Sequence, residues 1–358
     1  MDNTSRLILK NSTFFQQPSL FIGLPKDESL FFNEKSIAVT WAFDVFTALK
    51  NKIKNSTYFA CTLPEEHQYS QVIFFFPKEK ELATFWLEQF YFLAREKKLY
   101  LVGEKRSGIE SFIKKNKGDF AVCEKLDSAC HSQLWLIVLK EKNNEIKSFN
   151  LDRYYQNYEV NSNQGSLTIS ALPGVFSRAK LDQGTAFLLS TFKKGDISPG
   201  RKALDFGCGA GVIAATLSKQ YPKLEWDLID INYLSILSAK KTKMLNNFNA
   251  AIFESNGFEE IPSGKKYDII VSNPPFHDGQ KKTLETTERF LRESTLYLSG
   301  RGEIRIVANR FLPYLEIMEK HYSQVTIIAE NNAFRVYSGK QENIAESQSA
   351  DIDINHHF

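Results

Sequence analysis

The sequence has few cysteines, and their spacing excludes the usual zinc motifs. Its 358 residues include Cys61, Cys123, Cys130 and Cys208, and no two of these form a C-x-x-C pair. Structural zinc sites and disulfide frameworks both depend on characteristic cysteine spacings. We therefore expect no metal site, and thiols that stay reduced as in the cytoplasm.

Long apolar runs are also missing. No stretch approaches the roughly 20 apolar residues that a helix needs to cross a bilayer. The polar start, Met1–Arg6, does not resemble a secretory signal. Hydrophobic residues still make up 42% of the chain, which is enough for two domains with cores of their own. The sequence thus predicts a cytoplasmic protein with no membrane segment, and we expect a monomer.

Positive and negative charges nearly balance, and the net charge is only +3. Residues 1–150 carry 21 Lys and Arg against 18 Asp and Glu, and residues 151–340 carry 24 against 20. The tail, 341–358, carries none against 4, and this polar segment is expected to be disordered. Both larger segments are mildly basic, which permits contact with RNA without requiring it.

From residue 151 onward, short apolar segments alternate with segments of helical spacing. This alternation is typical of a mostly parallel sheet with helices on both faces. The expected strands are 202–206, 226–230, 251–254, 267–272 and 303–308; the expected helices are 212–220, 234–245 and 283–298; hairpins are expected at 159–169 and 324–337. Ligands on such a sheet bind at the carboxyl ends of its strands.

The strand expected at 267–272 is followed by Asn273-Pro274-Pro275-Phe276. The prolines fix φ and contribute no N–H group, so the turn is stiff and its carbonyls face outward. The Asn273 side-chain carbonyl and the Pro274 backbone carbonyl give two acceptors, which suit the two hydrogens of a planar NH2 group. Phe276 offers a ring on which a nucleobase can stack. Taken alone, the run also fits a rigid turn around a buried phenylalanine.

A glycine-rich loop lies upstream of this run. Residues 205–211 read D-F-G-C-G-A-G, between an apolar strand and the helix expected at 212–220. In this context a nucleotide-like ligand binds against the helix N-terminus. The glycines that let the backbone approach the ligand are Gly207, Gly209 and Gly211. Asp205, at the strand end, can accept a hydrogen bond from a ligand ammonium.

Asp230 ends the next strand, nineteen residues past Gly211, and is placed to take both hydroxyls of a ribose. The loop spacing is G-x-G-x-G rather than the G-x-G-x-x-G of dinucleotide enzymes, which argues against an NAD enzyme. A glycine loop alone is weak evidence. Followed by Asp230 and then by Asn273, it predicts S-adenosylmethionine (SAM) as the cofactor and an amino group as the methyl acceptor.

Residues from about Leu172 to Tyr337 resemble the catalytic domain of the bacterial small-subunit ribosomal RNA (guanine-N2)-methyltransferases, the C member of that group. The run Asn-Pro-Pro-Phe-His-Asp-Gly at 273–279 is the most specific part of the match, and further matches lie at 172–177, 181–184, 205–211 and 305–314. The resemblance implies an α/β fold of two tandem Rossmann-like class I methyltransferase domains. It also implies 16S ribosomal RNA, or the small subunit, as the substrate.

We place these domains at 1–150 and 151–340, and the resemblance implies that the first is degenerate and supports folding or RNA binding. The helix opened by Gln183-Gly184-Thr185 is expected to meet the methionine carboxylate with its first N–H groups. The loop around residues 172–178 is expected to be a lid over the site. The alternative interpretation, a loop that only covers the structure, is not excluded. The remaining candidates are Gly184 and Asn256 for the cofactor, and Pro275, His277, Phe176 and Arg178 for the substrate.

The first 150 residues look like a fainter copy of the rest. The apolar strand before Pro77 matches the strand before Pro274 at an offset of 197 residues, and Val102 matches Val307 at an offset of 205. Similar offsets at two anchors predict a duplication. Residues 30–60 contain no glycine, so we expect no cofactor loop in the copy. Phe76 is expected at the position of Asn273, where it gives no amide acceptor.

Two alternatives stay open. Adenine-N6 and protein-glutamine methyltransferases share the Asn-Pro-Pro-aromatic run, although the two-domain arrangement and the His-Asp-Gly extension favour guanine. The other alternative is a non-catalytic RNA-binding or assembly protein that kept the fold. The presence of both Asp230 and Asn273 argues against it.

Overall fold

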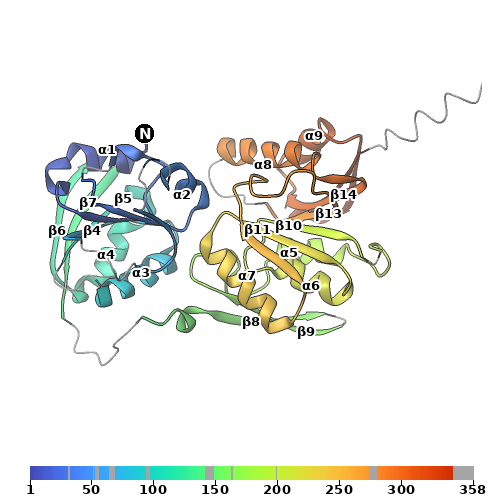
Figure 1. Ribbon diagram of the computed structural model, residues 1–358, viewed down its shortest axis with the longest axis horizontal. Coiled ribbons are helices and arrows are strands. Elements are labelled where there is room, and N and C mark those ends of the chain that lie inside the picture. The colour runs from blue at the N-terminus through green and yellow to red at the C-terminus, as the bar shows by residue number, and fades with distance from the viewer. Residues whose placement is uncertain are drawn as a thin grey trace, which may run out of the picture. The chain divides into compact units, whose positions relative to one another are not determined.

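The computed structural model describes residues 1–30, 33–50, 52, 56–63, 69–93, 97–141, 149–162, 164–198, 200–274 and 280–341 (Figure 1). Contacts divide the chain into two compact units. Unit 1 comprises Met1–Tyr155, Leu172–Val175 and Asn232–Leu234, and unit 2 comprises Gln156–Ala171, Phe176–Ile231 and the chain from Ser235 onward. Each unit is built around one seven-stranded sheet. The tail from residue 342 lies outside the described residues.

The sheet of unit 2 is mostly parallel, as the sequence predicts. Its order is β12-β11-β10-β13-β14-β16-β15, with parallel pairing from β12 to β14 and antiparallel pairing beyond β14. The strands are β10 (Lys202–Phe206), β11 (Glu225–Asp230), β12 (Ala250–Glu254), β13 (Tyr267–Ser272), β14 (Leu298–Asn309), β15 (Gln324–Glu330) and β16 (Phe334–Lys340). The hairpin expected at 159–169 is the separate pair β8 (Gln156–Ser162) and β9 (Gly165–Ala171).

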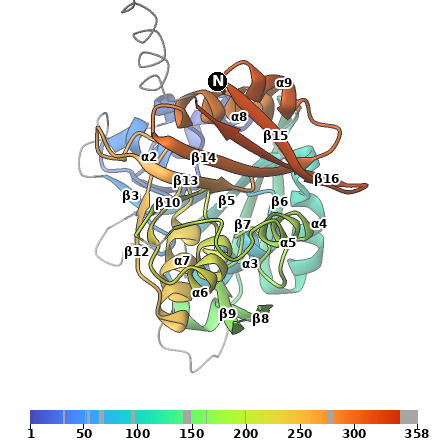
Figure 2. The same ribbon diagram turned by 90° about the vertical axis from the view of Figure 1, so that its right-hand side faces the viewer.

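Helices cover both faces of this sheet (Figure 2). One face carries α5 (Gln183–Ser190), α6 (Val212–Gln220) and α7 (Tyr233–Asn246), and the other carries α8 (Gln280–Ser294) and α9 (Tyr314–Glu319). The strands are therefore apolar on both sides. No helix in the described part of the chain has the length and apolar character needed to cross a membrane.

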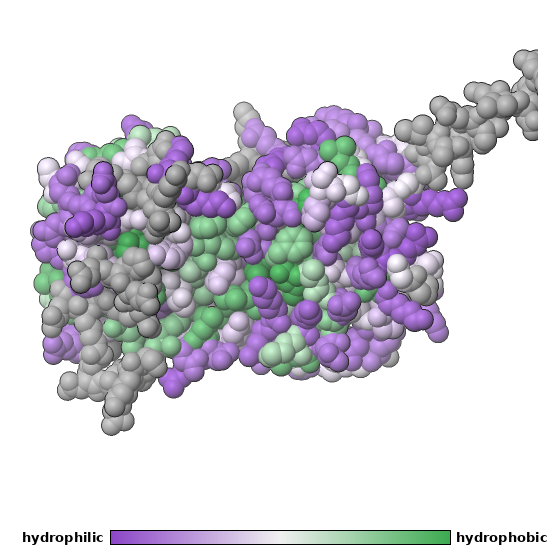
Figure 3. All heavy atoms as spheres, in the orientation of Figure 1, coloured by the Kyte–Doolittle hydropathy of each residue, from purple (hydrophilic) through white to green (hydrophobic). Residues whose placement is uncertain are grey.

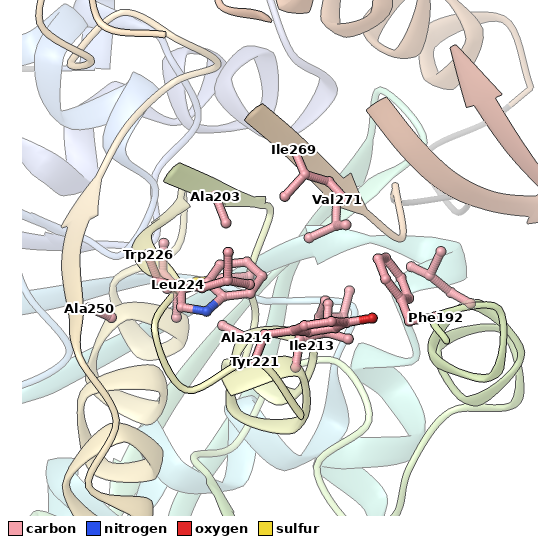
Figure 4. Close-up of a cluster of buried hydrophobic side chains, with 14 of the residues drawn as sticks. Phe192, Ala203, Ile213, Ala214, Tyr221, Leu224, Trp226, Ala250, Ile269 and Val271 are labelled. Carbon is pink, nitrogen blue, oxygen red and sulfur yellow. The ribbon is translucent and has the colours of Figure 1, made fainter. Parts of the chain in front are cut away.

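Two apolar clusters hold these layers together. Ile213 of α6 packs with Ala203, Trp226 and Val271 of the sheet in the first cluster (Figure 4). A second cluster on the opposite face joins strand residues to Phe290 of α8 and to Tyr314 of α9. The outer surface over α8 and α9 is mostly hydrophilic (Figure 3), as expected for helices that bury a single stripe.

Helix α8 ends earlier than the sequence predicts. A helix over 283–298 was expected, but α8 ends at Ser294, and Leu298 is the first residue of β14. The Ser294 hydroxyl donates to the Leu291 carbonyl at 2.9 Å, and Tyr297 N–H donates to the Ser294 carbonyl at 3.0 Å. Leu298 then pairs with Tyr267 of β13. The predicted last turn was wrong because sheet pairing takes Leu298 away from the helix.

The sheet of unit 1 has the same topology. Its order is β3-β2-β1-β4-β5-β7-β6, with the same relative sequence of strands as in unit 2. The strands are β1 (Ser19–Ile22), β2 (Ile37–Thr40), β3 (Thr57–Phe59), β4 (Gln71–Phe75), β5 (Lys98–Glu104), β6 (Phe120–Ala129) and β7 (Ser132–Leu139). The helices are α1 (Asn3–Lys10), α2 (Phe43–Lys50), α3 (Lys80–Leu93) and α4 (Ile109–Asn116).

The registers of the two sheets also agree, which supports the predicted duplication. In unit 1, Phe21 pairs with Ile73, which pairs with Tyr100. In unit 2, Asp205 pairs with Val271, which pairs with Arg305. These three residues correspond in the two sheets to Phe21, Ile73 and Tyr100. Counting along β5 and β14 from Tyr100 and Arg305 makes Val102 the equivalent of Val307, as the sequence comparison indicates.

The same register corrects one equivalence by a single residue. Phe75 pairs with Val102, whereas Asn273 follows Ser272, which pairs with Ile306. Phe75, not Phe76, therefore stands where Asn273 stands. The sequence comparison missed this because it aligned Pro77 with Pro274 instead of following the ladder. The consequence is unchanged, since a Phe75 side chain accepts no hydrogen bond from an amine.

The loop after β1 also differs from its expected description. Gly23 follows β1 and has φ +66°, close to the +67° of Gly207, which follows β10. The glycine-free interval 30–60, from which the sequence predicts that the copy has no cofactor loop, begins after Gly23 and so does not include this turn. A Cβ on Gly23 would lie 2.3 Å from the Trp41 ring, whereas Gly207 faces open space. Thr40 stands where Asp230 stands. Unit 1 therefore keeps the turn but not the side chains or the space of a cofactor site.

We predict that Gly211→Ala destabilises the protein more than Gly264→Ala. Both glycines have left-handed backbones, φ +76° and +78°, so each substitution adds about 1–2 kcal/mol of backbone strain. At Gly211 the new Cβ would also lie 3.3 Å from Leu228 Cδ2 and 3.4 Å from Ala239 Cβ, whereas Gly264 faces open space. Urea unfolding of the two variants measures the difference, and equal losses would contradict the crowding at Gly211.

Candidate functional site

Three polar side chains meet at one edge of the unit 2 sheet. Asp205 lies near the end of β10, Asp230 is the last residue of β11, and Asn273 directly follows β13. Because β10 pairs in parallel with both neighbours, the carboxyl ends of all three strands lie at the same edge. The structure thus brings together the three side chains that the sequence places at strand ends.

The glycine loop turns sharply beside this edge. Gly207, Gly209 and Gly211 all have positive φ, at +67°, +54° and +76°. A Cβ on Gly207 or Gly209 would meet open space, so the loop leaves its backbone uncovered at those two residues. Cys208 N–H donates to the Ile229 carbonyl at 3.0 Å, which ties the loop to β11. A ligand can therefore lie directly against this backbone.

Asp205 is fully buried and supports the helix that follows the loop. The N-cap of α6, Gly211, has no side chain to offer, and Asp205 Oδ2 accepts the Ala214 N–H at 3.2 Å in its place. Its other oxygen, Oδ1, is buried, and no residue in the described part of the chain makes a hydrogen bond to it. Contact with a ligand ammonium stays a prediction, because the structure shows Asp205 chiefly as a cap for α6.

Burial raises the pKa of Asp205 to about 7. The Ala214 N–H opposes this shift, and the nearby charge of Asp230 adds to it. The net effect therefore favours the protonated form of this carboxyl group relative to an exposed aspartate.

Asp230 holds the glycine loop from the neighbouring strand. Its Oδ2 accepts the Gly209 N–H at 2.9 Å, and its carbonyl accepts the Ser255 N–H at 3.0 Å. Asn256, the adenine candidate, follows Ser255 and donates from Nδ2 to Glu259 Oε1 at 2.8 Å. The carboxylate of Asp230 thus lies beside the open backbone at Gly209, where a ribose is expected, and both ligand contacts stay predictions.

The side-chain amide of Asn273 is held in one orientation. Its Nδ2 donates to Asp182 Oδ2 at 3.1 Å and to Thr185 Oγ1 at 2.9 Å. Its carbonyl oxygen, Oδ1, is buried and has no hydrogen-bond partner among the described residues. Pro274 is buried beside it. An unpartnered buried acceptor is costly, and such atoms often serve a ligand.

Asp182 and Thr185 were not singled out from the sequence as site residues. The available signal was Asp182 followed three residues later by Thr185, an N-cap pattern. Asp182 is the N-cap of α5, and its Oδ2 accepts the Thr185 N–H at 2.8 Å. That N–H, one of three expected to meet a methionine carboxylate, is therefore already taken. The proposed contact is left with the N–H groups of Gln183 and Gly184.

Two of the other substrate candidates, Phe176 and Arg178, are among the described residues. Phe176 is 53% exposed, and Arg178 Nε donates to the Ala171 carbonyl at 3.4 Å. Pro275, Phe276 and His277 lie outside the described residues. The roles of these residues stay predictions.

An open hollow of about 620 Å³ lies next to the N-terminal end of α5. It is lined by Gln183, Ala186 and Phe187 of α5 and by residues 331–334 of the β15–β16 turn. Phe334 also approaches Gly184, where a Cβ would come within 3.2 Å of the ring. No group of three or more His, Cys, Asp or Glu side chains in the described segments is arranged to hold a metal.

Two family models cover most of the chain. The methyltransferase small domain matches residues 166–338, and the methyltransferase small domain N-terminal matches residues 5–158. These two matches correspond to the two sheets of the structure.

Curated relatives match nearly the full length. A protein of Pseudomonas fluorescens named ribosomal RNA small subunit methyltransferase C is 35% identical over 341 residues, covering 95% of this chain and 100% of that protein. The protein of the same name from Shewanella sediminis is 38% identical over 349 residues, covering 95% of this chain and 99% of that protein.

A solved structure shares the fold of the whole chain. It is the T. thermophilus 16S rRNA N2 G1207 methyltransferase in complex with AdoMet and guanosine, with a TM-score of 0.76 and 19% identity. The similarity covers 91% of this chain and 88% of that one. The two-unit architecture is thus found in a second protein.

We predict that Asp205→Asn gains stability relative to the wild-type protein as pH rises from about 5 to 8. The folded pKa near 7 lies above the unfolded value near 3.9. The stabilisation from protonated Asp205 is therefore present below about pH 4 and is lost as pH rises through 7. An Asn side chain keeps an acceptor for the Ala214 N–H, but the stability of the variant no longer depends on the protonation of residue 205. Each pKa unit between the folded and unfolded states corresponds to about 1.4 kcal/mol, so the stability difference between variant and wild type should change by a few kcal/mol in total.

Urea unfolding without ligand at several pH values measures this difference, and a constant difference across the range would contradict it. Asp268→Asn is the matched control. Burial alone would raise the pKa of Asp268, but hydrogen bonds from Lys202 N–H, Ser299 and Arg201 outweigh burial and lower this pKa below its ordinary value. Its stabilisation is present above about pH 4 and is lost on acidification, so its difference from wild type changes only at low pH.

Proposed function

The chain belongs to the ribosomal RNA small subunit methyltransferase C family, and we propose that it transfers a methyl group from SAM to the exocyclic N2 amine of a guanine in 16S ribosomal RNA. The names of its relatives and the guanosine bound in the T. thermophilus structure support this substrate. The observation that carries the proposal is the Asn273 amide, whose carbonyl oxygen is buried, fixed at the carboxyl edge of the sheet and unpartnered within the described segments.

The residues at this edge fit SAM. The backbone at Gly207 and Gly209 is uncovered, and the Asp230 carboxylate lies beside it. Asp205 has one buried oxygen with no partner among the residues that the structure describes. In this proposal Asp230 takes the ribose hydroxyls, the loop backbone lies against the nucleoside, and Asn256 contacts the adenine. Bound SAM would supply a methyl group attached to a sulfonium: attack of the amine nitrogen on the methyl carbon would break the carbon–sulfur bond, release a neutral thioether and leave one amine proton to pass to solvent.

Asn273 and Pro274 act on the methyl acceptor. A guanine N2 amine is a weak nucleophile, because its lone pair is delocalised into the ring. Hydrogen bonds from its two hydrogens to Asn273 Oδ1 and the Pro274 carbonyl shift the nitrogen toward a tetrahedral geometry and aim its lone pair at the methyl group. Fixed acceptors in a buried site stabilise this geometry more than water does. Alignment rather than strong acid or base catalysis is therefore the main contribution.

The base must leave its stack to reach this site. We propose that Phe276 stacks on it and that Pro275, His277, Phe176 and Arg178 contact the base or its neighbours. The catalytic domain is placed at 151–340 and the degenerate domain at 1–150. The degenerate unit supports folding or RNA binding, and its mildly basic charge is compatible with either role. A cytoplasmic monomer acting on RNA or on the small subunit completes the proposal.

We predict that Asp230→Ala weakens SAM binding by on the order of 2–3 kcal/mol, the cost of losing charge-assisted hydrogen bonds. Titration calorimetry measures the affinity. Asp230→Asn is the matched variant, because it keeps an acceptor for the Gly209 N–H while removing the charge and one acceptor. We expect its affinity to lie between wild type and Asp230→Ala. Unchanged affinity in a folded Asp230→Ala variant would remove Asp230 from the cofactor site.

We predict that Asn273→Ala lowers methyl transfer by roughly two to three orders of magnitude while SAM affinity changes little. The loss resembles that of one preorganised polar contact made in the transition state. Single-turnover rates at saturating RNA and SAM measure it. Asn309→Ala, at the carboxyl end of the adjacent strand β14, is the control and should keep its rate. A wild-type rate in Asn273→Ala would contradict the amine-holder model.

A further inference from the structure

The orientation of the Asn273 amide follows from its neighbours. Asp182 Oδ2 already accepts the Thr185 N–H, so the amide atom that lies 3.1 Å from it is a donor, the nitrogen. The second hydrogen of that nitrogen goes to Thr185 Oγ1 at 2.9 Å. Both donors of the amide are therefore used, and Oδ1 is the remaining atom, buried and without a partner in the segments that the structure describes.

Asp182 and Thr185 are themselves fixed by the first turn of α5. Asp182 Oδ2 accepts the Thr185 N–H at 2.8 Å, and the Asp182 carbonyl accepts the Ala186 N–H at 2.9 Å. A Cβ on Gly184 would lie 3.0 Å from Asp182 Oδ2, so the glycine gives the carboxylate room in this position. One carboxylate oxygen thus caps the helix and receives the Asn273 amide.

We propose that Asp182 and Thr185 are positioning residues that hold the Asn273 amide with its carbonyl oxygen facing the guanine amine. This inference rests on the proposed function. Neither side chain needs to touch the substrate, because both act through the Asn273 nitrogen.

Charge as well as geometry favours this arrangement. A flipped amide would place Oδ1 against Asp182 Oδ2, and two acceptors at about 3 Å repel each other. A carboxylate that accepts an amide N–H also polarises the amide and leaves more negative charge on its carbonyl oxygen. The Oδ1 that receives the amine hydrogens is thereby both fixed and strengthened as an acceptor.

Thr185→Val tests the hydroxyl contact. Valine keeps the branched shape and the backbone N–H that Asp182 accepts, but it removes the acceptor for Asn273 Nδ2. We expect the single-turnover rate to fall by about tenfold, as for one lost hydrogen bond, with SAM affinity unchanged. Thr185→Ser keeps the hydroxyl and should retain most of the rate.

A double-mutant cycle shows whether Thr185 works through Asn273. If it does, Thr185→Val has no further effect in a protein that already carries Asn273→Ala, because the group it positions is gone. Multiplied losses in the double variant would overturn the proposal. An effect of Thr185→Val on SAM affinity with an unchanged transfer rate would also overturn it.

An exchange of the two side chains tests Asp182. Asn273→Asp places a second carboxylate about 3 Å from Asp182 Oδ2, so we expect it to lose at least as much rate as Asn273→Ala. Adding Asp182→Asn removes one of the two charges and can turn an amide donor toward the carboxylate at position 273, at the expense of the acceptor that Oδ2 gives the Thr185 N–H. The exchanged protein should recover at least tenfold over Asn273→Asp alone, and no recovery in a folded protein would overturn the role of Asp182.

The single variant Asn273→Ala separates this inference from the proposed function. If Asn273→Ala keeps the wild-type rate, the amine-holder model itself fails, and the positioning role fails with it. If Asn273→Ala loses rate but the Thr185 cycle is multiplicative and the exchange gives no recovery, the positioning role alone fails. Coupled losses at Thr185 together with recovery on exchange support both.

Discussion

The parallel pairing of β10 with β11 on one side and β13 on the other is the constraint on which this site depends. The pairings of Asp205 with Leu228 and with Val271 set where each strand ends. A shift of one residue in either pairing would turn the neighbouring side chains to the other face of the sheet. The glycine loop, Asp230 and Asn273 then lie together because their strands end at one edge. The helices on both faces bury the strands and hold that edge in place.

The two units show that this backbone does not by itself make a methyltransferase site. Unit 1 has the same strand order and register, and even a left-handed glycine after its first strand. Phe21, Thr40 and Phe75 stand where unit 2 has Asp205, Asp230 and Asn273. Apolar packing and the Trp41 ring take the place of polar groups and open space. The same strand order and register thus occur in unit 1 without the polar side chains of the candidate site.

Much of unit 2 follows from local sequence. The strands 202–206 and 267–272 and the helix 212–220 have the predicted bounds, because apolar runs end there at glycine, proline or charged residues. The end of α8 was missed because Leu298 fits helical spacing and is taken by the sheet through Tyr267, a contact outside its own segment. The register of unit 1 was misjudged by one residue for a similar reason, since a ladder is not visible in one strand.

The site divides in the same way. The placement of Asp205, Asp230 and Asn273 at one edge of the sheet could be predicted because each lies at or next to a strand end. That of Asp182 and Thr185 could not be predicted, because they lie 91 and 88 residues from Asn273 in the chain and meet it only in the folded protein. The capping role of Asp205 was missed for a related reason, since the absence of a side chain at the Gly211 N-cap becomes important only when α6 folds beside β10.

The most direct test of the central claim is to identify the methylated base. Purified protein and SAM are incubated with small ribosomal subunits, or with free 16S ribosomal RNA, from cells that lack this protein, and the nucleosides are mapped by mass spectrometry. The account predicts the gain of N2-methylguanosine at one position in at least one of the two substrates. A gain of N6-methyladenosine instead, or no transfer to either substrate, would contradict it.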